Sequence, residues 1–301
     1  MSKRCYLKGY YGYKNFGDEL LLFGVISYLS TLWYTHVAIE TPHIQWLRNR
    51  CKQHQHLYTL PFSALSFVAA NSRERRSFMD KVFGWGEVVT DARPFPYNGR
   101  NYLLWFFKDI LRWKYLLLWG IWTLSRSSTK ILYRVLLWKA SLIVVREEDS
   151  YRVAEKYSKH VVQYHDFAYD VLSGLDNCRI EKTWNDNKNG YGIINLTPYL
   201  RNDDIKKRIQ SLVNTYSWLQ WYSFPWEIGV DDKRQHEISE LVPWIQHFDR
   251  SKYSLEETIS FLSGATCALA SRLHVLVCLH RAGVPYEPVV YQEKIRKLGL
   301  A

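Results

Sequence analysis

Near its amino terminus the chain reads Gly9-Tyr10-Tyr11-Gly12-Tyr13-Lys14-Asn15-Phe16-Gly17-Asp18-Glu19. An apolar stretch over residues 5–7 precedes this segment, and residues 20–32 follow it with apolar side chains at helical spacing. The pattern predicts a strand, a glycine-rich turn and the start of a helix, with Asp18 capping the first N–H groups of that helix. Because ligands bind at the carboxyl ends of strands in open α/β sheets, we expect this turn to be a binding loop.

The turn lacks the composition of a phosphate-binding loop. Gly12 and Gly17 have the spacing of a Walker loop, but Asp18 and Glu19 stand where a lysine and a serine or threonine are required. The dinucleotide fingerprint GxGxxG is also absent. Asn15 and Asp18 suit sugar hydroxyls better than a phosphate. A plain glycine turn followed by a helix cap is the alternative explanation of this stretch.

The rest of the chain alternates short apolar strands with helices, the α/β pattern of parallel sheets with helices on both faces. With 301 residues, of which 47% are hydrophobic, the chain is long enough for two globular domains. The polar stretch over residues 176–190 is the best candidate for a linker. We therefore expect two Rossmann-like lobes, an N-terminal acceptor lobe over residues 1–178 and a C-terminal donor lobe over residues 179–301.

Each lobe has a predicted series of elements. In the first lobe we expect strands at 34–39, 115–119 and 142–145, helices at 43–53 and 129–140 and from 146, and a glycine-rich turn at 84–86. In the second lobe we expect strands at 191–196, 219–224, 267–270 and 288–291, and helices at 203–216, 232–241, 255–262 and 272–281. Ser254 and Glu257 form the sequence pattern of a capping box before the third of these helices.

Cysteine usage indicates the compartment. The five cysteines form an odd set without a CxxC pair, which favours reduced thiols in a cytoplasmic protein over a disulfide framework. The first strand begins almost at once, so we expect no secretory signal, and no apolar run approaches the length of a membrane span. Of the ten histidines only His54 and His56 are close in sequence, so we expect no metal site.

The charge is concentrated in one stretch. The formal net charge is +11, and residues 100–146 carry nine Lys and Arg against one acid, Asp109, with five tryptophans interleaved. A basic, tryptophan-rich surface suits the headgroup layer of an anionic membrane, which predicts peripheral membrane association. A solvated basic face over buried tryptophans is the alternative. We expect no nucleic-acid partner, because no nucleic-acid-binding motif accompanies the charge.

A second group of motifs lies at the other end of the chain. It consists of Ser271-Arg272-Leu273-His274, then Ala282-Gly283-Val284-Pro285, then Tyr291-x-x-Lys294. Together with the opening GYYGxxNxGDE, these motifs resemble the polysaccharide pyruvyl transferase family in order and spacing. The resemblance implies a GT-B-like arrangement of two lobes. It also implies transfer of the enolpyruvyl carbons of phosphoenolpyruvate onto two hydroxyls of a sugar, as a cyclic ketal, without a metal or other cofactor.

The resemblance assigns roles to the two end motifs. Arg272 and His274 lie at the start of a helix, where backbone N–H groups and the helix dipole favour an anion. Arginine binds phosphate or carboxylate with two parallel hydrogen bonds, and a protonated histidine beside a bound dianion suits a general acid. We expect His274, Arg272 and Asp18 to be catalytic. The expected donor-binding residues are Arg272, Leu273, His274, Arg201 and Lys294, and the expected acceptor-binding residues are Gly12, Asn15, Gly17 and Asp18.

Two positions depart from the family pattern. Thr197 stands where the family usually carries an arginine, so a charge for the donor would have to come from Arg201 in the next loop. Trp85 replaces a glycine in the turn expected at 84–86. These departures leave two other functions open, a nucleotide-sugar glycosyltransferase on the same frame and a non-catalytic glycan-binding or assembly module. Taken without the family, this helix start is better explained with Ser271 as a helix cap, Arg272 as a surface charge and His274 as a half-buried imidazole with satisfied polar atoms.

Overall fold

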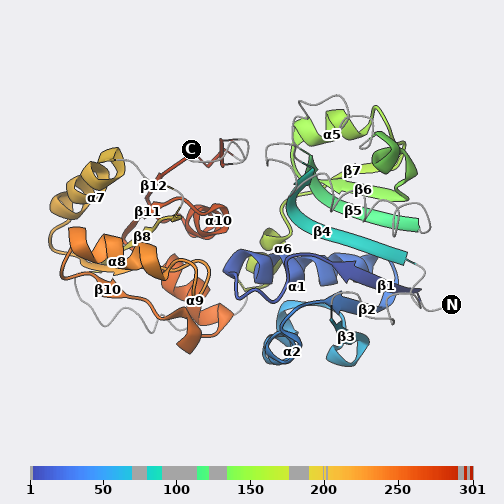
Figure 1. The fold of residues 1–301 in the computed structure, drawn as a ribbon, viewed down its shortest axis with the longest axis horizontal. Helices are drawn as coiled ribbons and strands as arrows, with labels where there is room; N and C mark the ends of the chain where they lie inside the picture. The colour runs from blue at the N-terminus through green and yellow to red at the C-terminus, as the bar shows by residue number, and fades with distance from the viewer. Residues whose placement is uncertain are drawn as a thin grey trace. The chain divides into compact units, whose positions relative to one another are not determined.

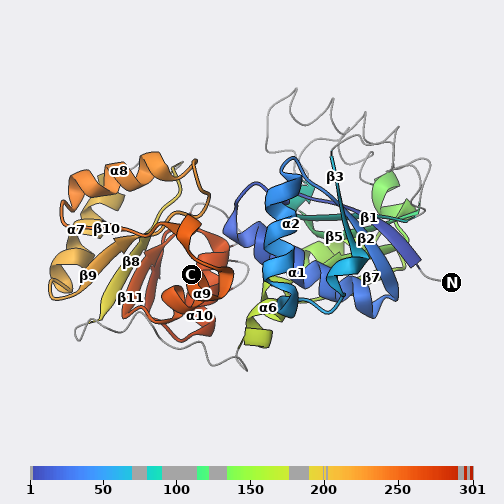
Figure 2. The ribbon, with the colours of Figure 1, turned by 90° about the horizontal axis from the view of Figure 1, so that it is seen from below.

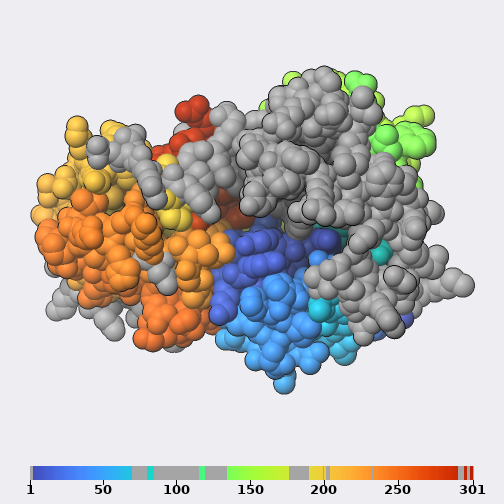
Figure 3. Space-filling model, viewed as in Figure 1, coloured from blue at the N-terminus to red at the C-terminus, as the bar shows by residue number. Residues whose placement is uncertain are grey.

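The structure is a computed structural model that describes residues 3–69, 80–89, 114–121, 134–175, 190–198, 200, 203–290, 295–296 and 299–300; Figure 3 draws the others in grey. The chain divides into two compact units, shown as ribbons in Figure 1. The first unit contains Met1–Tyr13 and Asp18–Val171. The second contains Lys14–Gly17 and Leu172–Ala301. Four residues of the opening loop therefore belong to the C-terminal unit.

The first unit is built on a seven-stranded parallel sheet of order β3-β2-β1-β4-β5-β6-β7. The strands are β1 (Lys3–Lys8), β2 (Tyr34–Glu40), β3 (Leu65–Val68), β4 (Asp80–Val89), β5 (Lys114–Ile121), β6 (Leu142–Val145) and β7 (Val161–Gln163). The labelled helices are α1 (Phe16–Thr31), α2 (Ile44–Gln53), α5 (Glu148–Ala154) and α6 (Ala168–Leu175). Three fully buried residues at the centre of β1, Cys5, Tyr6 and Leu7, form the middle of this sheet.

The second unit has a five-stranded parallel sheet of order β10-β9-β8-β11-β12. Its strands are β8 (Tyr191–Asn195), β9 (Gln220–Ser223), β10 (Gln246–His247), β11 (Cys267–Ala270) and β12 (Tyr286–Pro288). Its helices are α7 (Asp203–Thr215), α8 (Asp232–Leu241), α9 (Leu255–Ser263) and α10 (Leu273–Arg281). Figure 2 shows α7 and α8 on one face of this sheet and α9 and α10 on the other.

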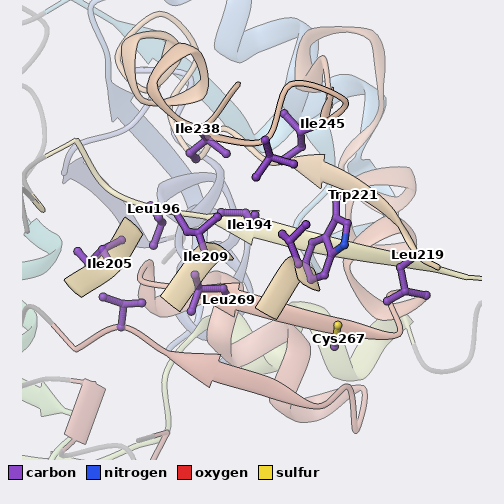
Figure 4. Close-up of a cluster of buried hydrophobic side chains, with 13 residues drawn as sticks. Ile194, Leu196, Ile205, Ile209, Leu219, Trp221, Ile238, Ile245, Cys267 and Leu269 are labelled. Atoms are coloured by element: carbon purple, nitrogen blue, oxygen red, sulfur yellow. The ribbon is translucent and has the colours of Figure 1, made fainter. Parts of the chain in front are cut away.

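Apolar side chains from the sheet and its helices form the core of the second unit. In Figure 4 Ile194 of β8, Trp221 of β9 and Leu269 of β11 meet Ile209 of α7 and Ile238 of α8. Trp221 is completely buried. The strand order reverses direction between β8 and β11, since the chain first runs outward to β10 and then returns to β11 and β12. In open α/β sheets this switch point, at the carboxyl ends of the strands, is where ligands bind.

The fold class predicted from the sequence is confirmed, because each unit is a parallel sheet flanked by helices. The capping box is also confirmed, with Ser254 accepting from the Glu257 N–H and Glu257 accepting from the Ser254 N–H. The division between the units falls inside α6, between residues 171 and 172, whereas the sequence placed it at 178. None of the helices in the described ranges is long and apolar enough to cross a membrane.

Three local predictions are wrong. α1 begins at Phe16, so Asp18 lies in its first turn, and the Asn15 side chain takes the cap position instead. The turn expected at 84–86 lies inside β4; Gly84 is a close-approach position, since a Cβ there would lie 2.4 Å from the Tyr11 hydroxyl. The last strand ends at Pro288 and does not begin there. Much of the basic stretch over 100–146 lies outside the described residues.

Candidate active site

Asn195, the last residue of β8, connects the three chain segments that meet at the switch point of the second unit. Its side-chain N–H donates to the Phe224 carbonyl after β9 (2.9 Å), and its side-chain oxygen accepts from the Arg272 N–H after β11 (3.3 Å). Its backbone carbonyl accepts from the Ser271 N–H (2.8 Å). Asn195 is completely buried, so these bonds fix the loops after β8, β9 and β11 against one another.

The start of α10 has no side-chain cap. The Ser271 hydroxyl accepts from the Thr197 N–H (2.8 Å), and Arg272, not Ser271, occupies the cap position. The alternative explanation of Ser271 as a helix cap is therefore wrong. Thr197 is completely buried, and within the described ranges its hydroxyl Oγ1 has no hydrogen-bond partner. Uncapped N–H groups and a buried hydroxyl thus occur together at this end of α10.

Arg272 is held in place by a buried carboxylate. Its Nη2 donates to Asp231 Oδ1 (2.8 Å), while Asp231 Oδ2 accepts from the N–H groups of Trp226 (2.7 Å) and Glu227 (3.1 Å). Asp231 is only 2% exposed, so it orients the guanidinium and the loop after β9 together. The Arg272 Nε–H is buried and finds no acceptor among the described residues. The guanidinium therefore keeps one directed donor for a ligand.

His274, in the first turn of α10, packs against an indole and a glycine. Its imidazole stacks on Trp226 with ring centroids 5.6 Å apart and planes 7° from parallel. A Cβ built on Gly17 would lie 2.2 Å from both His274 Nδ1 and Trp226 Cζ2, so the opening segment lies directly against this pair. His274 is 8% exposed. The glycine is required here because no side chain fits, and this close approach brings the two end motifs into contact.

Residues 14–17 are bound to the second unit by backbone and ring contacts. Asn15 forms an antiparallel bridge with Glu227, and the Phe16 N–H donates to the Trp226 carbonyl (3.2 Å). The Phe16 ring is completely buried and packs edge-on against Trp226 (5.4 Å) and Phe224 (6.1 Å). The strand-like pairing and the buried ring explain why this segment belongs to the C-terminal unit.

Charged groups surround that segment. Arg250, which is 5% exposed, donates to the Lys14 carbonyl and places its guanidinium 5.8 Å from the centre of the Phe16 ring. Glu227 is half-buried, and burial raises the pKa of its carboxyl. The Asp231 charge raises this pKa further, while Arg272, Arg250 and a hydrogen bond from the Asn15 side chain lower it. Two arginines and two carboxylates are therefore clustered here, buried or half-buried: Arg250, Arg272, Glu227 and Asp231.

The structure brings some of the predicted site residues together and places others elsewhere. Arg272, Leu273, His274, Asn15 and Gly17 come together in the second unit. Leu273 is 4% exposed, so its side chain is not available to a ligand. The Asn15 oxygen accepts from the Gly17 N–H (3.1 Å) and so caps α1.

The other predicted site residues lie in the first unit or outside the described residues. Gly12 and Asp18 belong to the first unit. Gly12 has a φ of +87°, and a Cβ there would lie 2.1 Å from Thr41 Oγ1. The backbone conformation and the close contact therefore explain why this residue is a glycine. Asp18 lies in the first turn of α1, where the dipole favours an acid. Arg201 and Lys294 lie outside the described residues.

The loop after β9 contributes site residues that were not predicted from the sequence. Trp226, Glu227 and Asp231 follow the carboxyl end of a predicted strand and precede a predicted helix, which is the position of a binding loop in an α/β fold. That position was the available signal. Arg250 carried none, because its contribution depends on the docking of residues 14–17.

The first unit also places a buried arginine at a strand end. Arg146 follows β6 and pairs with Asp166 (2.8 Å) and Glu147. Its Nη2 is buried without a hydrogen-bond partner in the described part of the chain. Nowhere in that part do three or more His, Cys, Asp or Glu side chains group as metal ligands would.

Comparison with known proteins identifies the family and the fold. The family model of polysaccharide pyruvyl transferases matches residues 15–285. A search of curated protein sequences gives no match. UDP-N-acetylglucosamine 2-epimerase from Rickettsia bellii is similar in structure, with a TM-score of 0.63, 12% identity, and coverage of 95% of this chain and 78% of that one.

Two further solved structures are similar. The UDP-GlcNAc 2-epimerase of Neisseria meningitidis bound to UDP-GlcNAc has a TM-score of 0.61 and 14% identity over 99% of this chain and 85% of that one. The S. aureus MnaA–UDP co-structure has a TM-score of 0.64 and 10% identity over 99% of this chain and 82% of that one. At these identities the likeness shows the fold alone, two Rossmann-like units of the GT-B class. Because the family match extends over most of its length, the chain belongs to the polysaccharide pyruvyl transferase family and is a transferase.

Proposed function

We propose that the protein transfers the enolpyruvyl carbons of phosphoenolpyruvate onto two hydroxyls of a sugar in a surface-polysaccharide precursor. One observation carries the proposal within the family: hydrogen-bond donors converge at the start of α10, where the cap residue supplies no side-chain acceptor. These are the uncapped N–H groups of the helix, the buried Thr197 hydroxyl and the Arg272 Nε–H, the last two without partners in the described ranges. Such a set fits an anion.

Directed hydrogen bonds, more than net positive charge, would hold the donor anion. Asp231 already balances Arg272, so the guanidinium contributes directed hydrogen bonds and part of its charge. The Thr197 hydroxyl supplies a neutral hydrogen bond where the family usually has an arginine. We therefore expect a modest affinity for phosphoenolpyruvate, increased by Arg201 or Lys294 if either reaches the phosphate.

His274 is the proposed proton donor to the methylene carbon of the donor. Adding a proton to that carbon turns it into a methyl group and makes the neighbouring carbon, C2, electrophilic. The stacked indole of Trp226 holds the imidazole in one plane, and the Gly17 backbone lies directly against both rings. A fixed ring costs little reorganisation when the proton moves.

We also propose where the protein works. The proposed acceptor is a sugar or a lipid-linked oligosaccharide, and the basic, tryptophan-rich stretch over 100–146 suits an anionic membrane surface. The proposed location is the cytoplasm, at the inner face of the membrane. Trp138 on this stretch is 74% exposed, which supports a surface role for at least one of its tryptophans.

The test is turnover of a defined donor. Wild type and the Arg272→Ala variant are incubated with phosphoenolpyruvate and a panel of methyl glycosides that carry free hydroxyl pairs, and phosphate release and ketal methyl signals are followed. We expect both signals from wild type, and a loss of about 2–5 kcal/mol in transition-state stabilisation in Arg272→Ala. Unchanged phosphate release in that variant would remove Arg272 from the mechanism.

A nucleotide sugar is the competing donor. The solved relatives named above include one bound to UDP-GlcNAc and one with UDP. With Thr197 in place of the arginine usual in the family, the site has one positive charge fewer for phosphoenolpyruvate, which keeps this alternative open. Thermal-shift measurements with phosphoenolpyruvate and UDP-GlcNAc in parallel separate the two, since stabilisation by UDP-GlcNAc alone would contradict the proposed donor.

A further inference from the structure

A carboxylate with no assigned role lies beside the Arg272–His274 pair. Glu227 follows Trp226, whose ring stacks on His274, and its own N–H is bound by the carboxylate that orients Arg272. Its side chain is half-buried and accepts a hydrogen bond from Asn15 of the opening segment. Backbone and side chain thus place Glu227 between the donor-site groups and residues 14–17.

We propose that the Glu227 carboxylate accepts the proton of the sugar hydroxyl that attacks the donor. The inference rests on the proposed function and adds the missing base to it. Ketal formation removes two hydroxyl protons, whereas His274 supplies only the single proton that the methylene carbon gains. After this step His274 can take back one of the two hydroxyl protons, so a second group must take the other and pass it to the leaving phosphate.

His274 and Glu227 together account for every proton that moves in the reaction. His274 protonates the methylene carbon, the first hydroxyl loses its proton to Glu227, and its oxygen bonds to C2. The bond between C2 and the phosphate oxygen breaks, and the leaving phosphate takes the proton from Glu227. The second hydroxyl then bonds to C2 and returns its proton to His274. Phosphoenolpyruvate and a diol give a ketal and hydrogen phosphate, with both residues restored.

The groups that face Glu227 suit this role. Arg272 before α10 and Arg250 after β10 favour its charged form, while Asp231 before α8 opposes it, and Asn15 from the opening segment donates a hydrogen bond. Burial outweighs the arginines, so the pKa of the carboxyl is raised above its ordinary value. A carboxylate of raised pKa is a stronger base near neutral pH than an exposed one.

The matched variants are Glu227→Gln and Glu240→Gln. Glutamine at 227 keeps the volume and an oxygen that accepts from Asn15, and Glu240 is an exposed carboxylate of α8 in the same unit. With phosphoenolpyruvate and the methyl glycoside panel, we expect kcat to fall by about 100–10,000-fold in Glu227→Gln, with little change in KM for phosphoenolpyruvate. The acidic limb of the pH profile of kcat/KM should disappear. Glu240→Gln should behave as wild type.

A purely structural role gives a different result. An intact acidic limb in the kcat/KM profile of Glu227→Gln, with the loss confined to KM, would overturn the inference. Wild-type turnover by Glu227→Gln would also overturn it. In both cases wild type still consumes phosphoenolpyruvate, and the proposed function stands. If wild type releases no phosphate and does not bind phosphoenolpyruvate in calorimetry, the proposed function fails and the inference fails with it.

Discussion

Replacing Gly17 by alanine tests the contact between the two end motifs. The new methyl group would lie 2.2 Å from His274 Nδ1 and 2.2 Å from Trp226 Cζ2, far inside van der Waals distance. Both rings are buried and stacked, so neither moves alone. Overpacking of this kind costs about 1–3 kcal/mol, and the gain of alanine over glycine in a helix returns about 0.5–1 kcal/mol. We expect a net loss in the free energy of unfolding of about 1 kcal/mol, and of about 2.5 kcal/mol at most.

The assay pairs thermal unfolding with phosphate release. A loss of this size lowers Tm by about 2–4 °C per kcal/mol in a protein of this size class. A shift of His274 by about 1 Å would lower kcat by about 100-fold. Gly174→Ala in α6 is the control, because a Cβ there meets no atom within 4 Å. If Gly17→Ala matches wild type in Tm, in the NMR shifts of the His274 imidazole and in kcat, the contact does not exist as described.

Three further changes follow from the same cluster. Asp231→Ala leaves Arg272 buried without its carboxylate and should cost about 3–5 kcal/mol in urea unfolding, whereas a loss below about 1 kcal/mol would show that the pair is solvated. Thr197→Val should not lower Tm, since the hydroxyl has no partner in the described ranges, yet it should weaken phosphoenolpyruvate binding in calorimetry by about 2–10-fold; unchanged binding would place the anion elsewhere. Because burial raises the Glu227 pKa, the folded state holds its proton to higher pH than the unfolded state. Stability should therefore fall as pH rises above the ordinary carboxyl value of 4.5, and Glu227→Gln should flatten this slope in urea titrations, with an unchanged slope arguing against a raised pKa.

Local sequence signals predicted most of the second unit. The alternation of apolar strands and helices predicted α8 and β11 with their observed bounds, and the pattern at Ser254 predicted the capping box. Each of these features depends on a few neighbouring residues. The start of α10 was located from Ser271 and Arg272, but the pairing of Ser271 with Thr197 was not. That bond joins residues separated by 74 positions, so no local pattern encodes it.

The site was less predictable for the same reason. The sequence predicts that Gly17 is a turn glycine. In the structure, glycine is required there because the ring of His274, near the other end of the sequence, lies against it. Asp18 is a residue type that commonly caps helices, yet docking of Phe16 between Phe224 and Trp226 extends the helix by three residues and makes Asn15 the cap. Tertiary packing overrides the local preference in both cases.

The most direct test of the account is a crystal structure of the protein with phosphoenolpyruvate. We predict phosphate or carboxylate density at the first turn of α10, within hydrogen-bond distance of Arg272 Nε and Thr197 Oγ1, with the methylene carbon facing His274. Density at another place in the molecule, or a donor site that takes UDP-GlcNAc and leaves phosphoenolpyruvate unbound, would contradict it.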